Sequence, residues 1–319
     1  MTILVLSRYK KKLWSFTKLF LKLFITGLSL YLVFKKVKIT DVREAFEHAN
    51  IFYLLFALLF FVISQVIASS RLNTFFKSAG VYLSGTLNFK VYLLGMFYNL
   101  FLPGGIGGDG YKVFLLKKKY NARGRDLLLS IFFDRLSGLW ALCLITSVFI
   151  VFIPGLHIPI WIPIVVMILG TGVYWLVIYI YFNKYNTHFL QAHIKALLVQ
   201  SMLVICAIFL LYALHLEGGY LPYLLVFLVS SLVAVFPFTV GGLGARELVF
   251  VYGANYLALN QHMAVLISLL FYCISAMMCF SGAYFVFNPG KLVWNNNLSE
   301  PSQVVEEVFE EEGRLLEIV

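Results

Sequence analysis

The sequence predicts an all-α polytopic membrane protein with about six full transmembrane helices and two re-entrant hairpins, each built around a glycine loop. Of the 319 residues, 61% are hydrophobic and 13% are charged, whereas a soluble domain carries about 25% charged residues. Apolar stretches long enough to cross a bilayer recur along the chain. Two glycine-rich segments, each followed by charged residues, interrupt this apolar pattern.

Six continuous apolar stretches give the predicted spans, each near the ~20 residues that a helix needs to cross the hydrocarbon core. They cover residues 14–34, 51–69, 127–153, 160–182, 194–215 and 263–287. The first stretch follows a basic segment and has no small-residue cleavage site behind it, so we interpret it as a retained span rather than a signal peptide. We therefore expect residues 1–290 to form a single transmembrane domain.

The net charge of +10 is unevenly distributed. Residues 299–319 hold seven Glu and one Arg, which leaves 24 basic and 8 acidic residues for the rest of the chain. Basic loops beside spans favour the cytoplasmic side of a membrane. We expect a protein of the cell membrane with both termini in the cytoplasm, where residues 291–319 form an acidic tail. Nucleic acid is a poor partner for a chain this apolar, and a membrane lipid is the expected one.

The first glycine loop lies in residues 99–112, which read NLFLPGGIGGDGYK. The apolar segment in front of it, residues 89–102, is too short to span comfortably at ~1.5 Å per residue. Irregular backbone survives at membrane depth only where protein buries it or where it lines a wet cavity. The dense basic cluster that follows favours a re-entrant hairpin that enters and leaves by the cytoplasmic face. The alternative is a short tilted span, which would place this cluster outside.

A second copy of the loop lies 137 residues downstream, where GGLGA at 241–245 matches GGIGG at 104–108. We expect residues 221–236 to enter the membrane and residues 248–259 to leave it. Three predicted spans separate the two loops, and because three is odd, the second loop enters from the opposite face. This arrangement is typical of inverted repeats in transporters, whose binding sites lie at such interrupted segments. The alternative is that the glycines serve only close helix packing.

Predicted span 127–153 carries two adjacent charges, Asp134 and Arg135. A charge inside a span costs a few kcal/mol on insertion scales and usually faces a partner or a cavity. Neighbouring helical residues do not share a face, so these two cannot simply neutralise each other. We expect each to pair with another segment. The alternative is that Arg135 extends to the interface while Asp134 caps a neighbouring helix.

Three stretches together resemble the transmembrane region of the lysylphosphatidylglycerol synthase family, a family of flippase-like integral membrane proteins. They are NLFLPGGIGGDGYKVFLL from Asn99, DRLSGL at 134–139 and PFTVGGLGARE at 237–247. The resemblance covers roughly residues 15–290 and implies a domain that moves a lipid between leaflets. Full-length synthases append a soluble aminoacyl-transferase domain. Because this chain ends about thirty residues after its last predicted span, we expect a stand-alone member, closer to a transporter than to an enzyme.

The resemblance also implies which residues form a site for an anionic or phosphate-bearing lipid head group. The expected members are polar residues that match the family pattern, together with the glycines of both loops: Arg71, Asn99, Gly104, Gly105, Gly107, Gly108, Asp109, Lys112, Asp134, Arg135, Gly241, Gly242, Gly244, Arg246 and Glu247. Lys112 stands where an arginine is common, which weakens any bidentate phosphate contact there. We expect Arg135 and Arg246 to hold the phosphate, and the glycine backbones to complete the anion site.

Two alternative functions remain open at this stage. The chain could be a membrane-embedded, lipid-modifying transferase with Asp134 or Glu247 as base, or a partner subunit of a separate lipid-modifying enzyme. No metal or other cofactor is expected. The four cysteines, Cys143, Cys206, Cys273 and Cys279, lie in predicted spans without metal-ligand spacing, so we interpret them as small apolar side chains.

Overall fold

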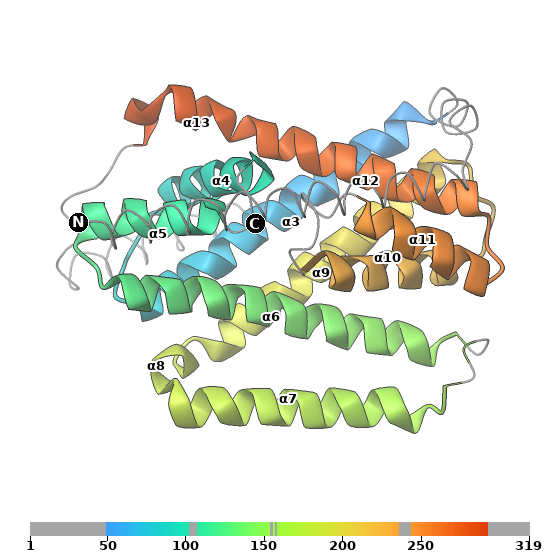
Figure 1. Cartoon of the computed structure of the whole chain (residues 1–319), viewed down its shortest axis with the longest axis horizontal. Helices are drawn as coiled ribbons and strands as arrows, with labels where there is room; N and C mark the ends of the chain where they lie inside the picture. Colours follow the sequence, from blue (N-terminus) through green and yellow to red (C-terminus); the bar gives the residue numbers. More distant parts are fainter. Residues whose placement is uncertain (1–48, 102–106, 154–155, 157, 236–243, 293–319) are drawn as a thin grey trace, which may run out of the picture.

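The computed structural model describes residues 49–101, 107–153, 156, 158–235 and 244–292, and these residues form a bundle of helices (Figure 1). In chain order the elements are α3 (Ile51–Ser78), α4 (Gly85–Phe101), α5 (Gly107–Tyr120), α6 (Gly124–Val151), α7 (Trp161–Tyr181), α8 (Asn183–Asn186), α9 (Phe189–Ala213), α10 (Tyr220–Val235), α11 (Ala245–Tyr256), α12 (Gln261–Ser281), α13 (Ala283–Phe287) and the 3-10 turn η2 (Pro289–Lys291). Predicted span 14–34 and the acidic tail lie outside the described residues.

Five helical segments in the described part of the chain are long and apolar enough to cross a membrane. They are α3, α6, α7, α9 and the continuous segment Gln261–Phe287, which joins α12 to α13. The predictions over 51–69, 127–153, 160–182, 194–215 and 263–287 are therefore confirmed as helices of membrane-spanning length. Helices of this length and apolarity are typical of an integral membrane protein.

Helix α3 is longer than the apolar stretch that predicts it. The sequence pattern stops at residue 69 because polar and basic residues follow, whereas the helix continues to Ser78. Arg71 is 7% exposed and lies within the bundle, where Asp134 of α6 neutralises it. Because its charge is paired inside the bundle, Arg71 can be buried there. It therefore does not mark the end of the helix.

Polar side chains fix where several helices begin. The side-chain oxygen of Asn50 accepts a hydrogen bond from Phe52 N at the start of α3, and Asn260 does the same for His262 N and Met263 N at the start of α12. At the start of α11, Gly244 has φ +85°, which favours glycine, and its N–H donates to Glu247 Oε2 over 2.6 Å. Each contact satisfies a backbone N–H that the helix itself leaves unpaired.

Two pairs of short helices, α4 with α5 and α10 with α11, pack as hairpins. Figure 1 places them at opposite ends of the long axis, the first beside the start of α6 and the second beside the start of α12. Their helices follow the sequence prediction closely, since α10 covers Tyr220–Val235 and α11 covers Ala245–Tyr256. Three candidate spans, α6, α7 and α9, separate the two hairpins along the chain.

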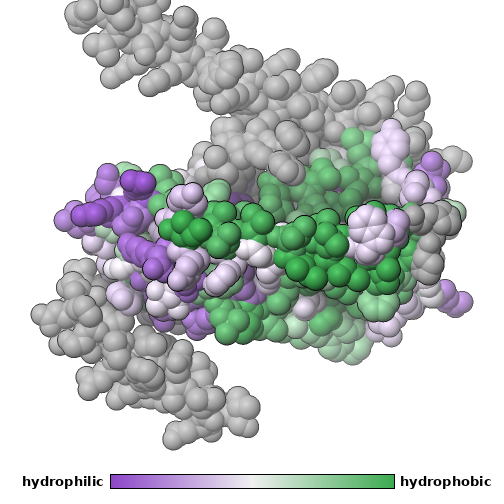
Figure 2. Space-filling view, turned by 90° about the horizontal axis from the view of Figure 1, so that it is seen from below, coloured by the Kyte–Doolittle hydropathy of each residue, from purple (hydrophilic) through white to green (hydrophobic). Residues whose placement is uncertain are grey.

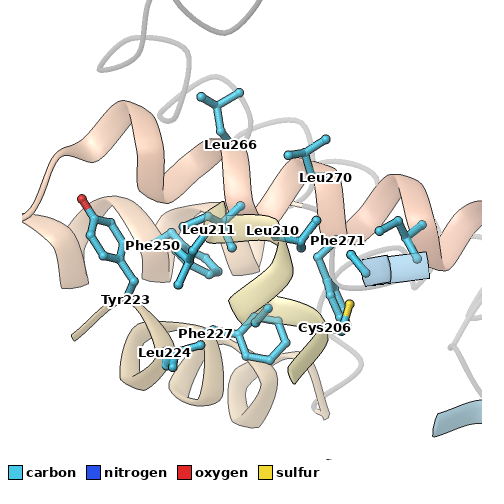
Figure 3. Close-up of a cluster of buried hydrophobic side chains, with 14 of the residues drawn as sticks. Cys206, Leu210, Leu211, Tyr223, Leu224, Phe227, Phe250, Leu266, Leu270 and Phe271 are labelled. Atoms are coloured by element: carbon cyan, nitrogen blue, oxygen red, sulfur yellow. The ribbon is translucent and has the colours of Figure 1, made fainter. Parts of the chain in front are cut away.

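The hydrophobic core lies around α9 to α12, with contributions from α3 and α6 (Figure 3). Phe227 of α10 and Phe271 of α12 meet edge to face, with ring centroids 4.9 Å apart. Helices α3 and α9 run antiparallel: Asn50 N donates to Ala213 O at one end, and Lys195 Nζ donates to Thr74 Oγ1 at the other. Helix α6 and the first hairpin pack against this pair of helices.

Apolar side chains cover much of the outer surface (Figure 2). Helix α7 is the clearest case, because Pro163 and Ile178 are its only buried residues. Hydrophilic residues gather at the end where α5 meets α6 (Figure 2), which carries the exposed Lys117, Lys118 and Lys119. A broad exposed apolar surface is what a membrane-embedded protein presents to lipid.

Candidate functional site: a charged cavity

A cavity of about 220 Å³ lies between α3, α4, α5 and α6, and its wall is unusually rich in charge for the interior of a membrane protein. Five charged residues line it: Arg71, Asp109, Lys112, Asp134 and Arg135. They come from α3, α5 and α6, so the cavity exists only because these helices pack together. Further lining residues include Tyr92, Asn99, Gly138, Gln200 and Val235.

One buried charge pair joins α3 to α6. Arg71 Nε lies 2.8 Å from Asp134 Oδ1, and Arg71 Nη2 donates to Oδ2 over 3.2 Å. Both side chains are about one-tenth exposed. Gly138, one turn after Asp134, leaves room for the guanidinium, since a Cβ there would lie 3.1 Å from Arg71 Nη1. The bidentate geometry fixes both side chains and is the strong form of this ion pair.

A second carboxylate, Asp109 in the first turn of α5, serves two cations. Lys112 Nζ lies 2.9 Å from Asp109 Oδ1, and Arg135 Nε donates to Oδ2 over 2.6 Å. Asp109 and Lys112 are buried, whereas the Arg135 side chain is 47% exposed. The position of Asp109 near a helix N-terminus also stabilises its negative charge. Arg135 is therefore the cation of this cluster that an incoming group can reach.

These contacts confirm the expectation that Asp134 and Arg135 each pair with another segment. Asp134 pairs with α3, and Arg135 pairs with α5. Asp134 does not cap a neighbouring helix; its carboxylate binds Arg71. Lys112, which the sequence places where an arginine is common, binds Asp109 and lies over the ring of Tyr92, 5.3 Å from its centroid.

Asn99 and Gly108 hold the first hairpin together. The side-chain oxygen of Asn99 accepts a hydrogen bond from Gly108 N over 2.8 Å, which caps the start of α5. A Cβ on Gly108 would lie 1.8 Å from Gly95 O, so α4 and α5 approach here more closely than a side chain allows. Gly108 thus has the close-packing role that the alternative interpretation of the glycines gives it.

Three further lining residues with a polar contact or a packing role were not foreseen from the sequence. Tyr92 shares one face of α4 with Met96 and Asn99, and its hydroxyl donates to Gln65 Oε1 over 3.1 Å. Gln200 is a polar residue in the middle of the apolar helix α9, and this interruption of the apolar pattern could have indicated a site residue from the sequence. Gly138 belongs to the DRLSGL stretch, but its role depends on where Arg71 lies.

Arg246 and Glu247 lie in a separate cluster around α11, outside the lining of the charged cavity as described. Arg246 Nη2 donates to Ser231 Oγ over 2.9 Å, and its guanidinium carbon lies 4.7 Å from the ring centroid of Phe271. Glu247 is fully buried and accepts from Gly244 N and from Ser268 Oγ. No carboxylate in the described part of the chain lies within ion-pair distance of Arg246.

The structure therefore brings six expected residues to one cavity: Arg71, Asn99, Asp109, Lys112, Asp134 and Arg135. Gly107 and Gly108 begin α5 beside it, and Gly244 precedes α11 in the second cluster. Gly104, Gly105, Gly241 and Gly242 lie outside the described residues. Among the described residues, no group of three or more His, Cys, Asp or Glu side chains is placed to hold a metal ion.

The charge count of the cavity indicates what it can bind. Three cations face two carboxylates, which leaves one positive charge in excess. Arg135 shares its carboxylate with Lys112 and is half exposed, so the excess is available at Arg135. A guanidinium donates two parallel hydrogen bonds to a phosphate or carboxylate. The arrangement suits a singly charged anion.

A family model for the lysylphosphatidylglycerol synthase TM region matches residues 19–282. A search of curated proteins found no match.

Proposed function

The chain belongs to the lysylphosphatidylglycerol synthase transmembrane-region family, and from this premise we propose that it moves a lipid with an anionic or phosphate-bearing head group between membrane leaflets. The observation that carries the proposal is the excess positive charge of the cavity, exposed at Arg135. The head group would bind Arg135 in competition with Asp109. While the site is empty, Asp109 and Asp134 hold the cations in place.

Arg246 is the second cation that we propose for the transport path. It is held by a neutral hydroxyl and aromatic rings, so an anion could approach it without displacing a carboxylate of the described part. Its partner Ser231 lies one turn before Val235 on α10, and Val235 lines the charged cavity. Ser231 and Val235 share one face of α10, so this helix contacts both Arg246 and the charged cavity. A lipid leaving Arg135 would meet Arg246 next.

We also propose that the two hairpins form an inverted repeat. Their positions at opposite ends of the bundle and the three intervening spans support entry from opposite faces (Figure 1). We place the end that carries Lys117 to Lys119 in the cytoplasm, because positive charge gathers on that side. We further propose that the protein lies in the cell membrane and that both termini are in the cytoplasm.

The test is leaflet exchange of a labelled phosphatidylglycerol in vesicles that contain the purified protein. We expect Arg135→Gln and Arg246→Gln each to slow exchange about tenfold, since a hydrogen bond to a charged group contributes about 1.5–3 kcal/mol. Arg125→Gln is the matched control, because Arg125 is exposed on the same helix as Arg135 and does not line the cavity. The variants are compared only after they elute as the parent does in size-exclusion chromatography.

Three results would contradict the proposal. Exchange at the parent rate by both Arg135→Gln and Arg246→Gln would place the transport site elsewhere. A parent protein that moves no lipid alone would instead favour the role of partner to a separate lipid-modifying enzyme, and co-purification with such an enzyme would then be the measurement to make. Turnover of lipid by the purified chain, lost in Asp134→Asn or Glu247→Gln, would favour the transferase alternative.

A further inference from the structure

A second cavity, of about 270 Å³, lies between α6 and α7 and is almost entirely apolar. Leu139, Trp140 and Cys143 line it from α6, and Gly170, Thr171 and Tyr174 line it from α7. Trp140 Nε1 donates to Thr171 Oγ1 over 3.0 Å, which holds the two helices together across the cavity. We call this space the α6–α7 groove.

The groove and the charged cavity are neighbours on one helix. The charged cavity is lined by Asp134, Arg135, Gly138 and Leu142 of α6, while the groove is lined by Leu136, Trp140, Cys143 and Ser147. These are adjacent stripes of helical spacing, and Leu139 belongs to both. Arg135 lies one turn before Leu139, on the same side of α6. A charged site and an apolar groove therefore meet at one residue.

We propose that the α6–α7 groove holds an acyl chain of the lipid whose head group binds at Arg135; this inference rests on the proposed function. An amphipathic ligand with a charged head and an apolar chain matches two neighbouring cavities that share Leu139 in their walls. The groove is too small for a helix, whose diameter with side chains is about 10–12 Å, whereas an extended acyl chain is thin enough to enter. The side chains of α7 around it are exposed at the surface of the described bundle. In a membrane protein such a surface faces lipid.

Binding in the groove gains packing rather than a hydrophobic driving force, because an acyl chain is already in an apolar environment in the bilayer. The groove would therefore select lipids by fit and fix the direction in which the head group enters. The second acyl chain would remain among the membrane lipids. An acyl chain bound in the groove beyond Leu139 would hold the phosphate of the same lipid beside Arg135.

Two glycines of α7 provide the test and its control. Gly170 lines the groove, whereas Gly172 does not, and a Cβ at either position would have no atom within 4 Å. Gly170→Leu thus places a side chain in the groove from a Cβ that meets no other atom, and Gly172→Leu makes the same change on another face of the helix. Binding of dioleoyl phosphatidylglycerol is measured by native mass spectrometry. Binding of glycerophosphoglycerol, the same head group without chains, is measured by the rise in melting temperature.

We expect Gly170→Leu to raise the Kd for the lipid at least about threefold and to leave the response to the chainless head group unchanged. Gly172→Leu should change neither. A parent-like Kd in Gly170→Leu, or equal weakening by both variants, would overturn the groove proposal. Arg135→Gln separates the two proposals: if it leaves binding of both ligands unchanged, the head-group site is wrong, and a parent that binds neither ligand overturns both.

Discussion

Charge pairing decides the behaviour of individual residues in the charged cavity. Arg71 and Asp134 are buried and paired with each other, whereas Arg135 is half exposed and shares Asp109 with Lys112. The first pair is a fixed part of the structure, because separating buried charges is costly. The cluster of Asp109, Lys112 and Arg135 has one cation more than its single carboxylate can neutralise. Residues of the same type, Arg71 and Arg135, therefore have different roles.

Removing one partner of the buried pair should destabilise the protein strongly. We expect Asp134→Asn to lower the free energy of unfolding by about 3–5 kcal/mol, since it leaves the Arg71 guanidinium buried without a counter-charge. Adding Arg71→Met should recover part of this loss. The measurement is denaturant unfolding in detergent. Lys184→Gln is the control, because it breaks the more exposed pair with Asp126 and should cost at most about 1 kcal/mol. Equal losses in Asp134→Asn and the control would contradict the assignment.

Close backbone packing decides the geometry of the first hairpin. Gly108 of α5 lies against the carbonyl of Gly95 of α4, and a side chain on Gly95 would in turn meet Lys112. Asn99 joins the same two helices through its hydrogen bond to Gly108 N. The hairpin thus positions Asp109 and Lys112 through a backbone contact at Gly108 that leaves no room for a Cβ.

A methyl group at Gly108 should separate the two helices. We expect Gly108→Ala to destabilise the protein by about 1–3 kcal/mol, as overpacking does, and to slow lipid exchange because Asp109 moves with α5. Gly110→Ala is the matched control, since Gly110 lies in the same helix with open space around it. Alanine favours a helix over glycine by up to about 1 kcal/mol, so the control should be equally or more stable. The reverse order of the two variants in thermal unfolding would refute this packing role.

The arrangement of the two hairpins decides the topology of the whole molecule. The first hairpin opens at the end that carries Lys117 to Lys119, and the second opens at the opposite end of the bundle (Figure 1). The long helices α3, α6, α9 and α12 connect the two ends. If the bundle lies across a membrane, the two hairpins enter from opposite sides.

Single-cysteine labelling tests this topology. In a background without the four native cysteines, Lys118→Cys and Glu217→Cys place thiols at exposed positions, the first in α5 and the second in the loop between α9 and α10. We expect a membrane-impermeant maleimide added outside intact cells to label position 217 and to reach position 118 only after the cells are opened. Labelling of both positions from the same side would contradict the inverted repeat.

The sequence alone determined which segments are helices of membrane-spanning length and where charge interrupts them, because hydropathy and helix-breaking residues act over short distances along the chain. It also determined that Asp134 and Arg135 need partners. Only the tertiary structure decided that Arg71 pairs with Asp134 and that Asp109 pairs with Arg135, since these partners lie on other helices and meet through packing. The same holds for Gly108, whose neighbour Gly95 is on another helix, and for Arg246, which packing places on aromatic rings in a separate cluster.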